Sequence, residues 1–328
     1  MSAILPLEPP TTEELRQALA RSFNGRVAND LQITARRPSA YQTSHALEEL
    51  DVAIDGRTLP VLFKNLSRRG LHHAASDVKP EFLHDPLREI VMYQQILPHV
   101  VAGTARCHAA IVDDERERYW LFLEKVSGVE LYQVGEIALW QNAARWLAVF
   151  HESTSGLAST VRSHLISYDG DYYRRWLNRA RDFSKGPPAS LDAAVTRFDD
   201  LTAGLAASPH GFVHGELYAS NVLIDPSVDA PRVCPIDWEM AGSGPVLLDL
   251  AALTAGDWTD DNRAAIVEAY REASDSVRPM PRADFMRSLA CCHAVLALQW
   301  LGWAEGWVPP KEHQRDWGAE LEMWLARI

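Results

Sequence analysis

The stretch VHGELYASNVLID, residues 213–225, decides how this sequence is interpreted. Three polar residues, His214, Glu216 and Asn221, lie in a short segment between apolar runs that are typical of strands. Catalytic side chains commonly lie on loops of this kind, because rigid strands position the loop and leave it accessible. The stretch therefore predicts a strand, a loop that carries chemically active residues, and a second strand.

Two carboxylates follow in IDWE at residues 236–239, at the end of another predicted strand. An amide oxygen and a carboxylate at neighbouring strand ends can bind Mg²⁺, which takes one or two carboxylates together with phosphate oxygens. Asn221 and Asp237 are therefore candidate magnesium ligands. Glu216 then remains to orient a substrate hydroxyl, and this division of roles is what phosphoryl transfer requires.

Around this loop, the apolar periodicity predicts a small β-rich half followed by a larger helical half. The only helices expected in the first half cover residues 11–20 and 85–97. Its strands are expected at 31–35, 46–54, 61–66, 109–112 and 119–126, with Asp55-Gly56 as a hairpin turn and Pro60 just before a strand. In the second half we expect a strand pair at 212–213 and 222–224, a strand at 233–236, and helices at 137–150, 172–183, 190–206, 247–255, 261–273, 282–303 and 312–328.

At this point the sequence resembles the aminoglycoside phosphotransferases and related small-molecule kinases. That family carries H-G-D-x-x-x-x-N, then I-D-W-E, then D-L-A; here HGELYASN stands at 214–221, IDWE at 236–239 and DLA at 249–251. Any one motif alone would be weak, but three in register are specific, and the resemblance covers roughly residues 25–310. It implies an α+β, bilobal protein-kinase-like fold with a small N-terminal lobe, an antiparallel sheet and one helix, and a larger, mainly helical C-terminal lobe.

The resemblance implies a nucleotide site in the N-terminal lobe, residues 1–126. Lys64 in VLFKNL matches the strand lysine that holds the α- and β-phosphates, and Glu89 in LREIVM matches its helix partner. Glu124 and Val126 in LEKV resemble the hinge, where the Glu124 carbonyl and the Val126 amide would hydrogen-bond adenine. The implied cofactors are ATP or GTP with Mg²⁺.

The resemblance assigns the catalytic loop to the C-terminal lobe, residues 127–328, together with the acceptor site. Asn221 and Asp237 match the Mg²⁺ ligands, and Asp249 matches the aspartate that braces the loop. Glu216 would orient the acceptor hydroxyl and accept its proton. His214, the other catalytic candidate, is expected to brace the loop by hydrogen bonds rather than to take protons.

The sequence departs from the family pattern in two places. Glu216 replaces the catalytic aspartate, and its extra methylene moves the carboxylate oxygens by about 1 Å, which can cost around a hundredfold in rate. A G-x-G-x-x-G loop is absent; PSAYQTS at 38–44 stands in its place, so backbone amides and Ser39 are the candidates to grip phosphate. The first departure leaves an alternative function open, a catalytically impaired pseudokinase that acts as a nucleotide-binding regulatory module.

Other residues with metal-like or catalytic character have ordinary structural interpretations. Cys291-Cys292-His293 lies in the apolar segment SLACCHAVLALQWLGW, which favours a buried helix over a metal site. His151 follows an apolar helical face and is expected to be structural. Glu239 could be a second metal ligand or a salt-bridge partner.

The charge balance bears on the partners. The net charge of −12 argues against a nucleic acid or an anionic membrane, and no apolar run has the length of a membrane span. Residues 127–328 carry 17 Lys and Arg against 27 Asp and Glu, a net of −10. A cationic or neutral hydroxyl acceptor is therefore favoured, such as an aminoglycoside or other antibiotic, an amino alcohol or a sugar. The expected location of the enzyme is the cytoplasm.

Overall fold

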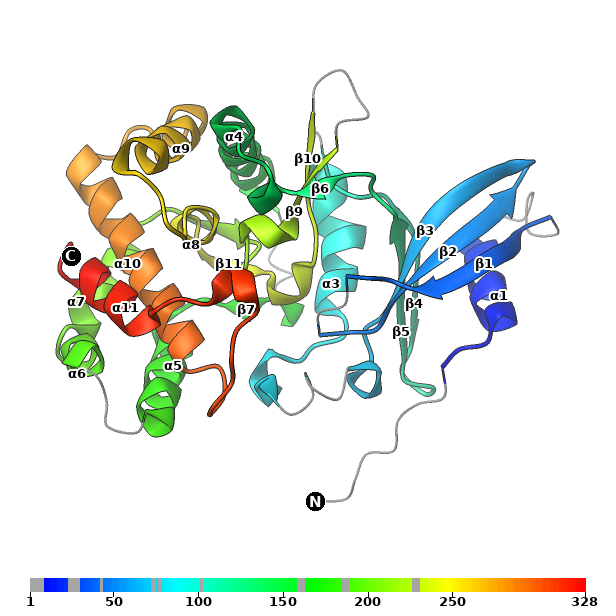
Figure 1. The fold of residues 1–328 in the computed structure, drawn as a ribbon, viewed down its shortest axis with the longest axis horizontal. Coiled ribbons are helices and arrows are strands. Elements are labelled where there is room, and N and C mark those ends of the chain that lie inside the picture. Colours follow the sequence, from blue (N-terminus) through cyan, green and yellow to red (C-terminus); the bar gives the residue numbers. More distant parts are fainter. Residues whose placement is uncertain are drawn as a thin grey trace. The chain divides into compact units, whose positions relative to one another are not determined.

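The computed structural model describes residues 9–22, 30–41, 44–71, 75, 78–100, 103–157, 163–184, 189–225 and 231–328. The chain divides into two units (Figure 1). The first comprises Met1–Gln94 and Ala105–Ser127, and the second comprises Gln95–Thr104 and Gly128–Ile328. The predicted boundary after residue 126 lies one residue from the change of unit at Ser127, but the short segment Gln95–Thr104 groups with the second unit.

The first unit is built on a five-stranded antiparallel sheet in the order β1-β2-β3-β5-β4. All five predicted strands are confirmed, with bounds β1 Gln32–Pro38, β2 Leu47–Ile54, β3 Arg57–Asn65, β4 Cys107–Asp113 and β5 Arg118–Glu124. Asp55 and Gly56 join β2 to β3 with φ of 49° and 71°. Positive φ at both central residues is what a two-residue hairpin of matching twist requires.

Pro60 lies inside β3, not before it as the sequence predicts. It stands opposite Asp51 of β2, three pairs beyond the hairpin closure at Ile54 and Arg57. Antiparallel pairs alternate in their hydrogen bonding, so this position points its backbone nitrogen away from β2. Pairing of β3 with β5 begins only at Val61, and the strand therefore tolerates the missing N–H at this point.

One face of the sheet is covered by α1, Thr12–Ser22, the capped helix predicted at the N-terminus. Its Leu15 and Leu19 are fully buried against alternate residues of β3, Val61 and Phe63. Because strand side chains alternate between faces, Lys64 lies on the opposite face. The predicted helix at 85–97 is present in shorter pieces, α3 at Arg88–Val91 followed by a π-helical segment at Met92–Ile96.

The second unit contains two three-stranded sheets, ordered β10-β9-β6 and β7-β11-β8. Their strands are short: β6 Val129–Glu130, β7 Ile166–Ser167, β8 His210–Val213, β9 Val222–Asp225, β10 Arg232–Pro235 and β11 Gly242–Pro245. The expected pairing of 212–213 with 222–224 is wrong, because β8 pairs with β11 whereas β9 pairs with β10 and β6.

Strand β11 escaped prediction because its sequence, GSGP, has no apolar alternation. A side chain at Gly242 would place its Cβ 2.4 Å from the Ile166 carbonyl oxygen and from the Tyr168 ring. Glycine therefore permits a close backbone approach here that no other residue allows.

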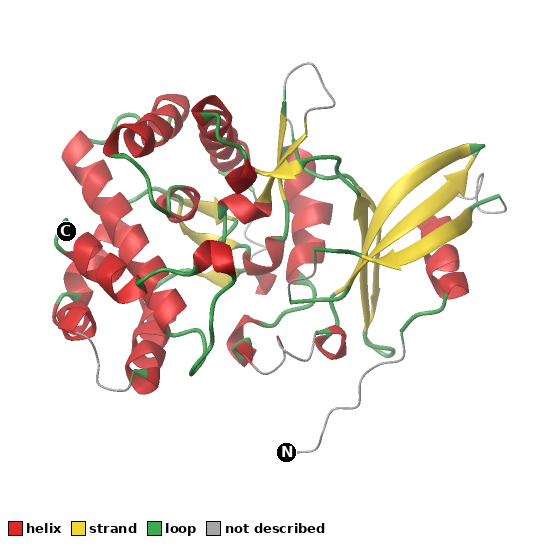
Figure 2. Ribbon diagram, viewed as in Figure 1, coloured by secondary structure: helices red, strands yellow, loops and turns green. Residues whose placement is uncertain are grey.

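Helices make up most of the second unit (Figure 2). Their bounds are α4 Ile137–Thr154, α5 Gly170–Phe183, α6 Ala189–Thr196, α7 Phe198–Ala206, α8 Leu247–Leu253, α9 Asp260–Ala273, α10 Arg282–Leu301 and α11 Trp317–Leu325. Helix α10 packs against α5, α7, α8 and α11, and its residues 288–299 are all buried. The Cys291-Cys292-His293 segment lies within this buried run, as expected, with His293 stacked on Trp324 at 3.9 Å between ring centroids.

Two predicted helices of the second unit differ most from the observed ones. The helix expected at 190–206 is divided at Arg197, whose backbone leaves the helical region at φ −103° and ψ 15°. The Arg197 guanidinium donates to the Leu325 carbonyl, which ties this break to the end of α11. The helix expected from 312 begins at Trp317, because Asp316 caps it by accepting from the Ala319 amide at 2.9 Å.

In the described part of the chain, no helix has both the length and the apolar character needed to cross a bilayer.

Candidate active site

The HGELYASN motif forms the connection between β8 and β9. Local hydrogen bonds shape it: the Tyr218 amide donates to the Glu216 carbonyl at 2.7 Å, and the Asn221 amide donates to the Tyr218 carbonyl at 2.8 Å. The Asn221 side-chain nitrogen also donates to the Glu216 carbonyl at 2.9 Å. The backbone of Glu216 is thus fixed from its C-terminal side.

His214 holds the same loop from the other side. Its ring Nε2 lies 2.9 Å from the Ile236 carbonyl oxygen, and its Nδ1 lies 3.3 Å from the Glu216 amide. A carbonyl can only accept, so Nε2 carries the proton and Nδ1 accepts from Glu216. Burial lowers the pKa of His214. Because both ring nitrogens are engaged in hydrogen bonds, His214 is suited to hold the Glu216 backbone in place.

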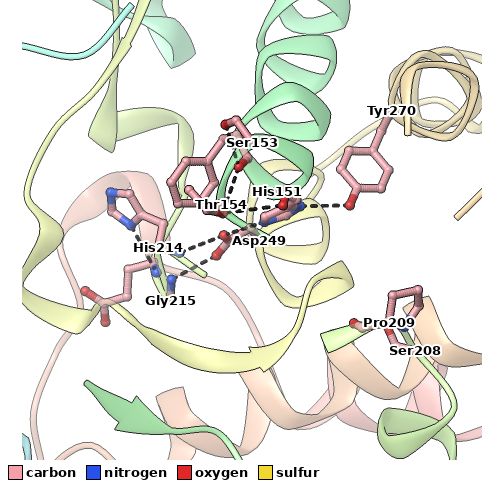
Figure 3. A network of polar contacts seen from close by, with 11 residues as sticks. His151, Ser153, Thr154, Ser208, Pro209, His214, Gly215, Asp249 and Tyr270 are labelled. Atoms are coloured by element: carbon pink, nitrogen blue, oxygen red, sulfur yellow. Dashed lines mark hydrogen bonds and ion pairs between the residues drawn. The ribbon is translucent and has the colours of Figure 1, made fainter. Parts of the chain in front are cut away.

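Asp249 of α8 anchors the start of the loop (Figure 3). Its carboxylate accepts from the His214 amide at 2.7 Å and from the Gly215 amide at 2.8 Å. His151 of α4 lies 3.3 Å from the same carboxylate through Nε2, and its Nδ1 lies 2.8 Å from the Tyr270 hydroxyl. Asp249 is completely buried, so this single carboxylate fixes the loop from the core of the second unit.

Gly215 is required at this corner for two reasons. Its φ of 86° lies in the region that side-chain-bearing residues avoid. A Cβ there would also lie 2.1 Å from the Tyr168 hydroxyl oxygen and 2.3 Å from the Met240 carbonyl oxygen.

Asn221 and Asp237, the candidate metal ligands, lie on neighbouring elements. Asn221 directly precedes β9, Asp237 follows β10, and the Ile236 amide donates to the Asn221 carbonyl at 2.9 Å. Since the Asn221 side-chain nitrogen donates to Glu216, its Oδ1 is the atom suited to a cation. Asp237 has φ 64° and ψ 66°. This left-handed backbone is costly for a residue with a side chain and is concentrated at functional sites.

Lys64 and Glu89, which the sequence pairs, are in contact within the first unit. The Lys64 Nζ and a Glu89 carboxylate oxygen are 2.7 Å apart, and both side chains are buried, with 4% and 2% of their surfaces exposed. Such long charged side chains are rarely buried unless they are paired. β3 and α3 therefore present a fixed cation on the sheet face opposite α1.

The other residues expected at the nucleotide site lie in the same unit. Glu124 ends β5, where its amide donates to the Arg106 carbonyl at 2.7 Å, and Val126 lies half-buried in the segment that follows. Ser39 is buried, and its hydroxyl accepts from the Tyr41 amide at 3.2 Å. Residues 42–43 of the expected phosphate loop lie outside the described residues. Roles in nucleotide binding remain predictions for these positions.

Contacts from the C-terminal part of the chain onto the loop were not foreseen. The Trp300 Nε1 donates to the Tyr218 hydroxyl at 2.7 Å, and His313 Nε2 lies 3.3 Å from the Ser220 hydroxyl. Burial lowers the pKa of His313 to about 4, so its ring is neutral at pH 7. The 82-residue separation of Trp300 from Tyr218 leaves no local signal for the contact.

Gln299 of α10 was also missed, although it reaches the Glu216 side chain. Its Nε2 lies 3.3 Å from Glu216 Oε1. Two stacked pairs of tryptophans involve residues near Gln299 in the sequence. Trp300 stacks on Trp307 at 5.6 Å, and Trp303 stacks on Trp176 at 5.7 Å between ring centroids.

Comparison with known proteins places this geometry in context. A sequence profile described as the phosphotransferase enzyme family matches residues 78–285. No curated protein sequence matches the chain.

Solved structures resemble the whole fold. A microcompartment-associated aminopropanol kinase is 17% identical, with a TM-score of 0.59 over 97% of this chain and 95% of that one. An ethanolamine kinase from Plasmodium vivax is 11% identical, with a TM-score of 0.58 over 99% and 91%. A macrolide 2'-phosphotransferase from Brachybacterium faecium is 14% identical, with a TM-score of 0.58 over 91% and 94%. At such identities the likeness establishes the kinase-like fold.

Proposed function

This chain belongs to the phosphotransferase enzyme family, and from that premise we propose that it transfers the γ-phosphate of ATP or GTP to a hydroxyl of a small molecule. The observation that carries the proposal is the loop at residues 214–221. Its backbone is clamped by Asp249 and His214 and presents the Glu216 carboxylate, while Asn221 adjoins the strained Asp237. A loop held this firmly meets the requirement that catalytic groups be preorganised.

In the proposed reaction each group has one task. Glu216 accepts a hydrogen bond from the acceptor hydroxyl and takes its proton as the oxygen attacks phosphorus. Lys64, held by Glu89, neutralises phosphate charge. Asn221 Oδ1 and the Asp237 carboxylate are oxygen donors of the kind that Mg²⁺ prefers, and the bound ion would offset the charge on the phosphates.

The acceptor is proposed to be a hydroxyl compound that carries an amine. Residues 127–328 have a net charge of −10, which favours a cation. The indole rings of Trp300, Trp303 and Trp307 lie in one cluster, and Trp300 donates to the hydroxyl of Tyr218 in the catalytic loop. Indole faces attract ammonium groups. Aminopropanol and ethanolamine, which are named for two of the similar structures, have this chemistry, and so do aminoglycosides.

A coupled turnover assay tests this function. The full chain with Mg²⁺ and either ATP or GTP is screened against amino alcohols, aminoglycosides, macrolides and sugars, with Glu216→Ala and an inert Glu272→Ala variant as controls. Glu272 is exposed on α9, outside the groups assigned to the reaction or to the acceptor. We expect acceptor-dependent ADP or GDP release from the wild type and Glu272→Ala, and at least about a hundredfold less from Glu216→Ala.

The alternative, a nucleotide-binding pseudokinase, is favoured only by the glutamate at position 216. It predicts Mg²⁺-dependent nucleotide binding with no acceptor-stimulated release. Retention of full turnover in Glu216→Ala would contradict the role that we assign to Glu216.

A further inference from the structure

The position of the Glu216 carboxylate needs an explanation that its own backbone does not supply. Glutamate has one more rotatable bond than aspartate, so a fixed backbone does not by itself fix the position of its carboxylate. Ordering such a side chain costs conformational entropy. A displacement of about 1 Å at a reacting group can cost around a hundredfold in rate. Some group outside the loop must therefore hold this carboxylate for efficient transfer.

Gln299 is placed to do so. Its side chain is 4% exposed, and its Nε2 lies 3.3 Å from Glu216 Oε1. Behind it, the Tyr172 hydroxyl of α5 lies 3.5 Å from Gln299 Oε1. The tyrosine can donate to the amide oxygen only if the amide nitrogen faces Glu216, so the two contacts together select one orientation of the amide.

The support for this contact is rigid. Gln299 ends the buried run of α10, and Tyr172 is buried with its ring in edge contact with those of Tyr168 and Trp176. Groups on packed helices hold a side chain more accurately than groups on loops. An amide donor also suits the proposed role of Glu216 as a base. It orients the carboxylate without a positive charge, whereas a lysine or arginine would make the carboxylate less able to take up a proton.

We propose that Gln299, backed by Tyr172, is a positioning residue. It holds the longer Glu216 side chain so that its carboxylate stays in the position that phosphate transfer requires. The proposal rests on the proposed phosphotransfer function. The donor from α10 matches the reach of glutamate, and an aspartate at position 216 is too short to keep the contact. Position 299 and position 216 therefore form a functional pair across 83 residues of sequence.

The test uses Gln299→Leu, which removes the donor at similar volume, and Gln299→Glu, which keeps the shape and places a second carboxylate beside Glu216. Gln141→Leu is the matched control, because Gln141 is a half-buried helical glutamine that donates to the Ala265 carbonyl at 3.4 Å. A lost hydrogen bond to a charged group predicts a fall in kcat of about tenfold to a hundredfold in Gln299→Leu. We expect the KM for the nucleotide to stay within about twofold, Gln299→Glu to fall further, and the control to match the wild type.

A double-mutant comparison separates positioning from a general structural defect. In a Glu216→Asp background, Gln299→Leu should change kcat by less than about threefold, because the contact is already lost.

Each outcome has a definite meaning. Wild-type activity in Gln299→Leu, or losses that multiply fully with Glu216→Asp, would overturn the positioning role while leaving the phosphotransferase function intact. If the wild type transfers phosphate to no acceptor, the proposed function fails and the positioning role fails with it.

Discussion

Two carboxylates of the candidate active site, Glu216 and Asp237, are held in place in different ways. Glu216 has a backbone held by His214 and Asn221 and a side chain contacted from another helix. Asp237 holds a left-handed backbone, at φ 64°, that a residue with a side chain adopts only under constraint from its surroundings. Because such strain costs of order 1–3 kcal/mol, its presence in the IDWE motif supports a functional role for that carboxylate.

Asp237→Ala should abolish phosphate transfer and leave the fold intact. The substitution removes the only carboxylate assigned to Mg²⁺ without opening a buried cavity, since Asp237 is half-buried. We expect turnover to fall by at least about a hundredfold, in line with the loss of one preorganised electrostatic group. Turnover at saturating acceptor and the circular dichroism melt measure the two effects. Unchanged turnover would refute the metal assignment.

At the scale of elements, the loop depends on helices that are distant in sequence. Asp249 of α8 fixes its start. The carbonyl of Ile236, directly after β10, accepts from the His214 ring, and His313, beyond α10, contacts its end. The loop is therefore a junction of several elements. Its own regular structure is limited to a short 3-10 turn at Ala219–Asn221, so its position depends on these contacts.

Asp249→Asn should weaken this junction and the whole second unit. The buried carboxylate accepts from two backbone amides and faces His151, and an asparagine can offer only one acceptor atom in its place. Breaking such a buried charged network costs about 3 kcal/mol of unfolding free energy. Urea denaturation measures the loss, with Asp182→Asn on the exposed face of α5 as the control. Equal stability of the two variants would contradict the bracing role.

At the scale of the whole molecule, buried histidines make stability depend on pH. Burial lowers the pKa of His214, His293 and His313, the last to about 4. A histidine whose folded-state pKa is depressed binds fewer protons in the folded state than in the unfolded state. Stability therefore falls as the pH drops from about 6.5 towards the folded-state pKa.

The free energy of unfolding should decrease between pH 6.5 and pH 5, where ordinary carboxylates remain ionised in both states. A pKa shift from 6.5 to about 4 makes the His313 contribution about 1.5 kcal/mol over this interval. His313→Phe keeps the edge contact with the Tyr218 ring but cannot titrate. Denaturation at both pH values should show the variant losing about 1.5 kcal/mol less than the wild type. An identical loss in both proteins would disprove the burial argument.

Much of the fold and of the candidate site follows from the sequence by itself. The five strands of the first sheet, the helical character of the second unit and the HGELYASN, IDWE and DLA motifs depend on neighbours within a few residues. Periodicity and turn chemistry encode such local features directly. The pairing of Lys64 with Glu89 was also predicted, because the resemblance to small-molecule kinases supplied a partner that periodicity does not.

Only the tertiary structure decided which distant residues meet. It paired β8 with β11 rather than β9, divided the 190–206 helix at Arg197, and brought Gln299 to Glu216 across 83 residues. Strand GSGP has no apolar pattern, and the Arg197 break depends on a carbonyl 128 residues away. Such contacts are set by the packing of whole elements around a shared core, which local propensity does not encode.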